Sequence, residues 1–220
     1  MSVKMLRFET REQWLQARTG KIGGSDASAI MGLNPYKTNV ELWEEKTGLS
    51  VAEDIREKPY VKYGTDAEKH LRDLFAMDFP QYDVFYVENN MWINDKYPFA
   101  HASLDGWLYD RVSNKNGILE IKTTEILKSM QKEKWKNRIP DNYYVQILHC
   151  LMVTEFEFVE LKAQLKTVFD GRPYLQTKHY LFELSNADVY EDLQVLIEEE
   201  FKFYEAMKSG TRPPLILPEI

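Results

Sequence analysis

The chain has 220 residues, of which 44% are hydrophobic, and a formal net charge of −7 at pH 7. This length fits one globular domain with a sizeable core, and the acidic balance argues against a protein coated in positive charge. A nuclease can still confine its basic residues to one groove, so nucleic acid is not excluded as a ligand. The single cysteine, Cys150, excludes a disulfide framework and a cysteine-ligated metal site.

The sequence also bears on where the protein acts. The opening segment, residues 1–8, is too short and too polar for a signal peptide. No apolar run approaches the roughly 20 residues that cross a bilayer. These features predict a cytoplasmic protein without membrane contact, which would be the host bacterial cytoplasm for a phage-encoded chain.

Helices are predicted first along the chain. Capping patterns and following glycines predict helices over residues 10–18 and 38–47. Between them, the glycine pair 23–24 leads into a brief helix for which Ser25 is the expected N-cap. Residues 59–80 begin with proline and carry apolar side chains at helical spacing, which predicts a longer helix.

Strand patterns follow. Residues 84–93 are rich in aromatic and β-branched side chains, and residues 103–110 and 118–124 flank a polar turn. Together they predict an antiparallel meander. Residues 125–137 are then expected to be helical, and Asp141 is expected to cap the next helix.

Two alternating segments near the C-terminus predict a hairpin around Asp170-Gly171, and Ser185 or Asn186 is expected to cap a final helix. The sum is a mixed α/β fold, a central mixed sheet flanked by helices. We expect a single domain over residues 1–220. Its expected parts are a motif-bearing core over about 13–154, a C-terminal hairpin and helix over 155–209, and an extended tail over 210–220.

Acidic and basic side chains meet in the middle of the predicted sheet. Glu120 and Lys122 are two apart on one strand and therefore share a face, and the preceding strand delivers Asp105. Mg²⁺ prefers hard oxygen ligands, which Asp105, Glu120 and the carbonyl of Ile121 could supply. In a phosphodiester hydrolysis at such a site, Lys122 would orient the attacking water or stabilise the charged transition state, rather than act as a formal base. Such a Glu-x-Lys pair alone is more often a solvated strand face, but the flanking residues here are apolar.

Asp105 followed by Glu120-Ile121-Lys122 resembles the PD-(D/E)xK nuclease signature. Leu104 stands where that signature often has proline. More narrowly, five blocks in order resemble the lambda-exonuclease-like (YqaJ-type) viral recombinase nucleases, whose core is restriction-endonuclease-like. The blocks are residues 18–25, 63–68, 101–106, 119–122 and 143–146.

The resemblance implies roles for further residues. Glu68 would be a carboxylate near the metal, and Gln146 would bind the nucleophilic water or substrate. From the residues alone, an exposed helix glutamate is the preferred interpretation of Glu68, whereas a polar residue on an amphipathic helix is an equally plausible interpretation of Gln146. Arg18 and Ser25 would bind the 5′-terminal phosphate, with Tyr143 among the DNA-binding residues. A glycine pair, a hydroxyl and a helix N-terminus suit an anion, although a tight turn explains the same pattern.

Residues 128–138 form a basic segment in an acidic chain. Its cations are Lys128, Lys132, Lys134, Lys136 and Arg138. A solvated helix face and a contact with the DNA backbone explain this segment equally well. Trp135 is expected to be buried rather than stacked on DNA. His101 and His149 lack metal-ligand spacing, so no metal is assigned to them.

The implied activity is a Mg²⁺-dependent 5′-to-3′ exonuclease, with Mn²⁺ as a substitute, which digests one strand of linear double-stranded DNA and leaves a 3′ overhang. The implied partners are double-stranded DNA ends, a single-strand annealing protein and further copies of the chain in a ring, as a trimer. Two alternatives are an endonuclease of restriction or repair type and a non-catalytic DNA-binding protein.

Overall fold

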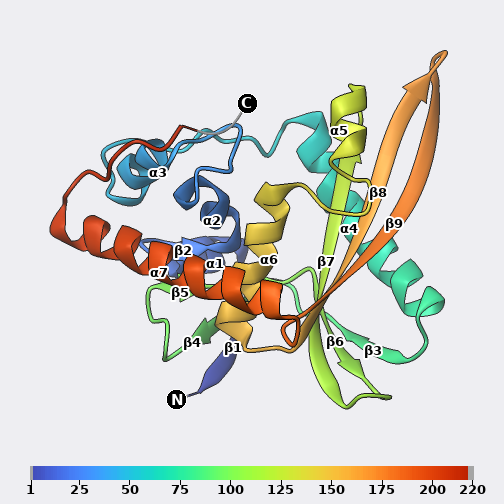
Figure 1. Ribbon diagram of the computed structural model, residues 1–220, viewed down its shortest axis with the longest axis horizontal. Helices are drawn as coiled ribbons and strands as arrows, with labels where there is room; N and C mark the ends of the chain where they lie inside the picture. The colour runs from blue at the N-terminus through green and yellow to red at the C-terminus, as the bar shows by residue number, and fades with distance from the viewer. Residues whose placement is uncertain (1, 218–220) are drawn as a thin grey trace.

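The computed structural model describes residues 2–217. Met1 and residues 218–220, the outer ends of the expected opening segment and tail, lie outside the described residues. A five-stranded mixed sheet forms the centre of the molecule (Figure 1). In spatial order its strands are β3 Tyr82–Phe85, β6 Gly106–Asp110, β7 Lys115–Glu125, β8 Phe158–Phe169 and β9 Arg172–Glu183.

Strands β7 and β8 pair in parallel, and the other neighbours in this sheet pair antiparallel. A parallel pair needs a crossover connection. Here the crossover carries a short helix, α5 Ser129–Glu133, and a longer one, α6 Asp141–Thr154. The antiparallel β8–β9 hairpin reaches beyond the other elements at the upper right of Figure 1.

Helices cover both faces of the sheet. Leu71 of α4 Pro59–Asp78 shares a buried cluster with Leu119 of β7, whereas Leu148 of α6 shares a second cluster with Ile118 of the same strand. Successive strand residues point to opposite faces, so α4 and α6 pack on opposite sides of β7. The predicted mixed α/β architecture is confirmed.

Two small sheets bring the front of the chain to this core. Strand β1 Val3–Arg7 pairs antiparallel with β4 Asn90–Asn94, and β2 Ile22–Gly23 pairs in parallel with β5 Ala100–His101. The remaining helices are α1 Arg11–Arg18, α2 Gly24–Ile30, α3 Asn39–Lys46 and α7 Ala187–Ser209. None of the helices within residues 2–217 is both long and apolar enough to cross a membrane.

The strand predicted over residues 84–93 is wrong as a single element. The chain divides it between β3, in the central sheet, and β4, which pairs with β1. Asn89 between them has a φ of 52°, and Asn90 donates from Nδ2 to the carbonyl of Val87 at 2.9 Å. An asparagine tolerates this left-handed conformation, so the chain turns where a continuous strand was expected.

The helix predicted over residues 125–137 is much shorter in the structure. Strand β7 continues through Glu125, and Ile126 donates its N–H to the carbonyl of Lys166 at 2.7 Å. Pairing with β8 thus satisfies backbone groups that the sequence pattern assigned to a helix. Trp135 is 1% exposed, which confirms its expected burial, and its carbonyl accepts a hydrogen bond from Lys178 Nζ at 2.6 Å.

Two predicted helix caps are wrong by one or two residues. Gly23, not Ser25, is the N-cap of α2, and the Asp26 carboxylate accepts the Gly23 N–H at 2.8 Å. Pro140, not Asp141, precedes the first residue of α6. Asn186 caps α7 as predicted. The hairpin turn is also confirmed, because residues 170 and 171 have φ of 49° and 70°.

Candidate active site

Glu120 and Lys122 lie side by side on β7 and face α6. The Lys122 ammonium is 2.6 Å from Oε1 of Glu120, which is only 2% exposed. Gln146 of α6 donates from Nε2 to the same Glu120 oxygen at 2.9 Å and accepts from Lys122 Nζ at 3.0 Å. The three predicted side chains therefore form one closed set of contacts, in which the amide of Gln146 bridges the carboxylate and the ammonium.

Asp105 joins this set from the bend just before β6, and not from within a strand as predicted. Its Oδ2 accepts the Ile121 N–H at 2.8 Å, which holds the carboxylate against β7. Asn90 fixes the preceding residue, because its side chain both donates to the Leu104 carbonyl and accepts the Leu104 N–H at 2.9 Å. Arg72 donates to the carbonyl of Asp105 itself.

The sequence patterns did not predict these two supporting residues, Asn90 and Arg72. Asn90 and Arg72 are 4% and 8% exposed. A polar side chain inside an apolar strand and an arginine on the apolar face of a helix were the available signals. Both need partners when buried, but neither signal identifies Leu104 or Asp105 as the partner.

Carboxylates are crowded at this point. Burial, together with the charges of Glu120 and Glu68, raises the pKa of Asp105 well above its ordinary value. Burial also raises the pKa of Glu68, against the opposing charge of Arg72. Burial away from water disfavours the ionised form of a carboxylic acid, and nearby negative charges disfavour it as well. A bound cation would relieve both effects.

Lys122 remains charged in this setting. Burial acts to lower the pKa of Lys122, but the Glu120 and Asp105 carboxylates outweigh it and raise that pKa above the ordinary value. The ammonium also lies 4.8 Å from the ring centroid of Tyr143, within the range of a cation–π contact. Such a group suits electrostatic stabilisation better than proton abstraction.

A cleft of about 240 Å³ opens beside these side chains. Glu68 and Tyr143, which were predicted at the site, line it together with Ile121 and Lys122. Its other lining residues are Tyr60, Val61, Gly64, Thr65 and Thr123. The cleft therefore lies between the first turns of α4, strand β7 and the start of α6, where a substrate could reach the buried set.

The front motif adjoins the same place. A Cβ at Gly24 would lie 3.2 Å from Gln146 Cγ, a tighter contact than usual, so glycine at this position favours the close packing of α2 against α6. Arg18 lies over the Trp14 ring, 4.1 Å from its centroid, and donates from Nε to His101. Ser25 is exposed in the first turn of α2.

The predicted basic residues stand apart from the cleft. Lys128, Lys132 and Lys134 are exposed on α5 and at its two ends, and none of them lines the cleft. The structure thus leaves them available for a surface ligand without placing them among the carboxylates.

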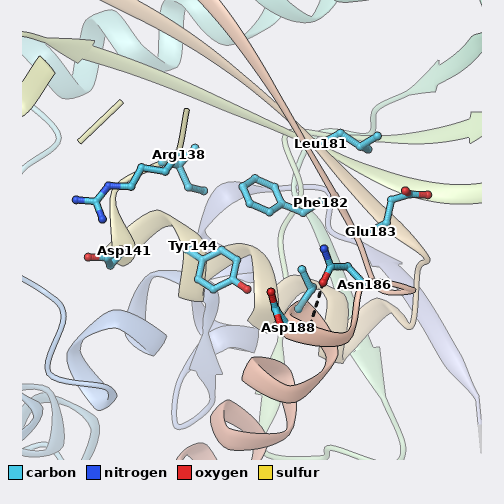
Figure 2. A pocket seen from close by; sticks show the side chains of 10 residues that line it. Arg138, Asp141, Tyr144, Leu181, Phe182, Glu183, Asn186 and Asp188 are labelled. Carbon is cyan, nitrogen blue, oxygen red and sulfur yellow. Dashed lines mark hydrogen bonds between the residues drawn. The ribbon is translucent and has the colours of Figure 1, made fainter. Parts of the chain in front are cut away.

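A larger hollow of about 470 Å³ lies elsewhere, between α6, β9 and the start of α7 (Figure 2). Arg138, Asp141, Tyr144 and Asp188 are among the side chains around it. None of the residues predicted for the site lines it. The smaller cleft, and not this hollow, is therefore lined by predicted site residues.

Known proteins resemble this chain in sequence and in fold. The family profile described as the YqaJ-like viral recombinase domain matches residues 13–157, which contain every residue of the carboxylate cluster. The chain belongs to this family. The YqaJ protein of Bacillus subtilis (strain 168) is 30% identical over 211 residues, which cover 94% of this YqaJ-like chain and 59% of that relative. The chain therefore spans about three-fifths of the relative's length.

Two solved structures share the fold of this YqaJ-like chain. An alkaline exonuclease (LHK-Exo) from Laribacter hongkongensis superposes with a TM-score of 0.60 at 18% identity, covering 90% of this chain and 97% of that one. A second structure of LHK-Exo, in complex with dAMP, superposes with a TM-score of 0.59. A phage related exonuclease from Haemophilus somnus 129PT gives 0.51 at 12% identity, covering 86% and 96%.

Proposed function

We propose that this chain is a Mg²⁺-dependent exonuclease that digests the 5′-ended strand of linear double-stranded DNA and leaves a 3′ overhang. The observation that carries the proposal is the closed contact set of Glu120, Lys122 and Gln146 beside Asp105. The likeness in fold to exonucleases supports it, and one of them binds a nucleotide, dAMP.

The donor set fits a hard divalent cation. Asp105 and Glu120 offer carboxylate oxygens, and the Ile121 carbonyl lies between Glu120 and Lys122 on the same strand. Within residues 2–217, no three His, Cys, Asp or Glu side chains could together hold a metal. The proposed site uses two carboxylates and a backbone oxygen, which matches the few protein ligands that Mg²⁺ usually takes. Bound there, Mg²⁺ or Mn²⁺ would offset phosphate charge and make a water nucleophilic.

The chain's own residues would prepare the substrate. The charged Lys122 would stabilise negative charge that builds up on the phosphate, since it is held in place by Glu120 and Gln146. Glu68 and Tyr143 would contact water and DNA at the mouth of the cleft. Arg18 and Ser25 would bind the 5′-phosphate, and Lys128, Lys132 and Lys134 would contact the DNA backbone.

The remaining proposals concern assembly and setting. A ring-shaped homotrimer would keep an acidic chain on its DNA, and a single-strand annealing protein would receive the 3′ overhang. The domain organisation over residues 1–220 and the cytoplasmic setting also stay predictions. The trimer can be tested by measuring the solution mass of the purified protein with and without duplex DNA.

The deciding experiment is digestion of linear duplex with 5′-phosphate or 5′-hydroxyl ends, with Mg²⁺ and with a chelator. We expect fast digestion of phosphorylated ends with Mg²⁺ and none with the chelator. Closed circular plasmid is the control. Cutting of the plasmid as fast as the phosphorylated linear duplex would indicate an endonuclease of restriction or repair type. Binding to duplex without any cleavage would indicate a non-catalytic DNA-binding protein.

A further inference from the structure

A buried histidine supports the arginine at the front of the chain. Nε of Arg18 donates to Nε2 of His101 at 3.4 Å, and the Trp14 ring covers one face of the guanidinium at 4.1 Å. Within residues 2–217, no other side-chain hydrogen bond engages Arg18, so its two terminal nitrogens can form the paired hydrogen bonds that a phosphate accepts.

The contact fixes the tautomer of His101. Arginine has donors and no acceptor, so Nε2 of His101 must accept and its ring proton must sit on Nδ1. His101 is 2% exposed, and among the described residues its Nδ1 has no hydrogen-bond partner. Most buried donors are paired, and an orphan one is costly. The imidazole orientation therefore provides an acceptor for Arg18 at Nε2 and leaves Nδ1 without a hydrogen-bond partner among the described residues.

The surrounding backbone holds the imidazole in place. The His101 carbonyl accepts from His149 Nε2 at 2.8 Å, and Gly23 pairs with His101 in the β2–β5 register. A Cβ built on Gly23 would lie 2.9 Å from His101 Nε2. Position 23 must therefore lack a side chain for the ring to occupy its place beside Arg18.

We propose that His101 is a positioning residue that orients Arg18 toward the 5′-terminal phosphate and so sets the preference for phosphorylated DNA ends. The inference rests on the proposed exonuclease function. Burial, together with the charges of Arg18 and His149, lowers the pKa of His101 to about 2. The ring therefore stays neutral, and able to accept from Arg18, throughout the pH range in which the protein would work.

The test compares digestion rates on 5′-phosphorylated and 5′-hydroxyl duplex. His101→Phe keeps an aromatic ring without an acceptor, and we expect it to lower the phosphate preference about tenfold, the size of one hydrogen bond to a charged group. The rate on 5′-hydroxyl ends should stay within about twofold. His101→Gln restores an acceptor and should recover the preference. Adding His101→Phe to Arg18→Ala should cause no further loss.

Gly23→Ala is an independent variant, since it would displace the ring without changing its chemistry, and it should also lower the preference. An unchanged preference in His101→Phe would overturn the proposal. Nitrogen NMR of the wild-type imidazoles, assigned by comparison with His101→Gln, needs no destabilised variant. We expect one of the four histidines to keep an Nδ1–H tautomer down to pH 5, and an imidazolium or Nε2–H form at His101 would also overturn it.

Failure of the exonuclease itself would give a different pattern. Should wild-type protein digest no linear duplex with Mg²⁺, the proposed function fails. Binding of phosphorylated against hydroxyl-ended duplex in chelator then tests His101 alone. His101→Phe should weaken only the phosphorylated complex, and equal weakening of both would overturn the positioning role.

Discussion

Lys122 and Lys162 lie on neighbouring parallel strands, and their side chains leave opposite faces of the central sheet. Lys122 pairs across the strands with Ala163, and Lys162 with Ile121. Lys122 reaches Gln146 of α6 at 3.0 Å, whereas Lys162 lies 3.5 Å from the Asp78 carboxylate of α4. Each lysine follows a glutamate by two residues, so the chain contains two Glu-x-Lys pairs in adjacent strands.

This relationship supplies a matched pair of variants. Lys122→Met should reduce hydrolysis of linear duplex by about 10²–10³-fold, the usual effect of removing one preorganised electrostatic stabiliser. Duplex binding should persist, because the other basic residues remain. Lys162→Met should keep activity within about twofold, since its side chain packs beneath α4. Rates and binding would be measured on the same preparations, and equal activity of Lys122→Met and wild type would refute the assignment of the centre.

The two Glu-x-Lys pairs also mark the limit of sequence reasoning. Both pairs have the same residue types at the same spacing, and both glutamates are buried. Family resemblance singled out Glu120, and only the strand register places Glu160 and Lys162 on the α4 face. Glu160 accepts a hydrogen bond from the Tyr82 hydroxyl, and burial raises the pKa of Glu160 to about 7.

Local patterns did predict most elements, because caps, turns and apolar periodicity act within a few residues. The helix after β7 failed because long-range pairing between Ile126 and Lys166 decided the backbone conformation. The hydrogen bond from Arg72 to the Asp105 carbonyl could not be predicted either, because it is also a long-range contact. It depends on how α4 packs beside β6, and no spacing within the sequence encodes that contact.

Removing the charge of Asp105 should stabilise the metal-free protein. Burial, Glu120 and Glu68 raise the pKa of Asp105. The folded state therefore holds this proton more tightly than the unfolded state, and stability falls as pH rises from the ordinary value of 3.8 toward the raised one. Asp105→Asn should raise Tm in chelator at pH 8 by roughly 2–4 °C, the shift that about 1 kcal/mol produces in a chain of this size.

Thermal unfolding with and without Mg²⁺ checks this prediction. Mg²⁺ should raise the Tm of wild type more at pH 8 than at pH 6, and it should do little to Asp105→Asn. Asp110→Asn is the control, because hydrogen bonds from Ser113 and Val112 lower the pKa of Asp110 and its loss should not raise Tm. A Tm of Asp105→Asn below that of wild type in chelator would contradict the expected sign.

A buried ion pair should make stability depend on pH. Nδ1 of His149 is 2.7 Å from the Glu200 carboxylate, and both side chains are fully buried. Burial opposes the charge, but Glu200 and the His101 carbonyl outweigh it and raise the pKa of His149 above 6.5. The stabilisation is therefore complete below pH 6.5 and is lost as pH rises through the folded-state pKa.

Glu200→Gln should remove this dependence, because a neutral histidine can accept from the new amide. Wild-type stability should fall by up to about 1.4 kcal/mol per pH unit in the window above pH 6.5, and the variant should show a flatter slope. Denaturant unfolding at several pH values measures both. Glu199→Gln, at a surface pair with Lys202, is the control and should keep the wild-type slope. Parallel slopes for wild type and Glu200→Gln would show that the pair does not titrate.

The basic segment can be tested by the salt dependence of DNA binding. Each phosphate contact contributes about −0.9 to the slope of log K against log salt on duplex DNA. Replacing Lys128, Lys132 and Lys134 together by glutamine should therefore make the slope shallower by up to about 3, with binding measured between 50 and 200 mM salt. Because backbone contacts carry no sequence information, the loss of affinity should be equal on different sequences.

Lys202→Gln with Lys208→Gln is the control. It removes two α7 lysines that are paired with Glu199 and Glu205, and it should leave the slope unchanged. An unchanged slope in the triple variant would identify the segment as a solvated face.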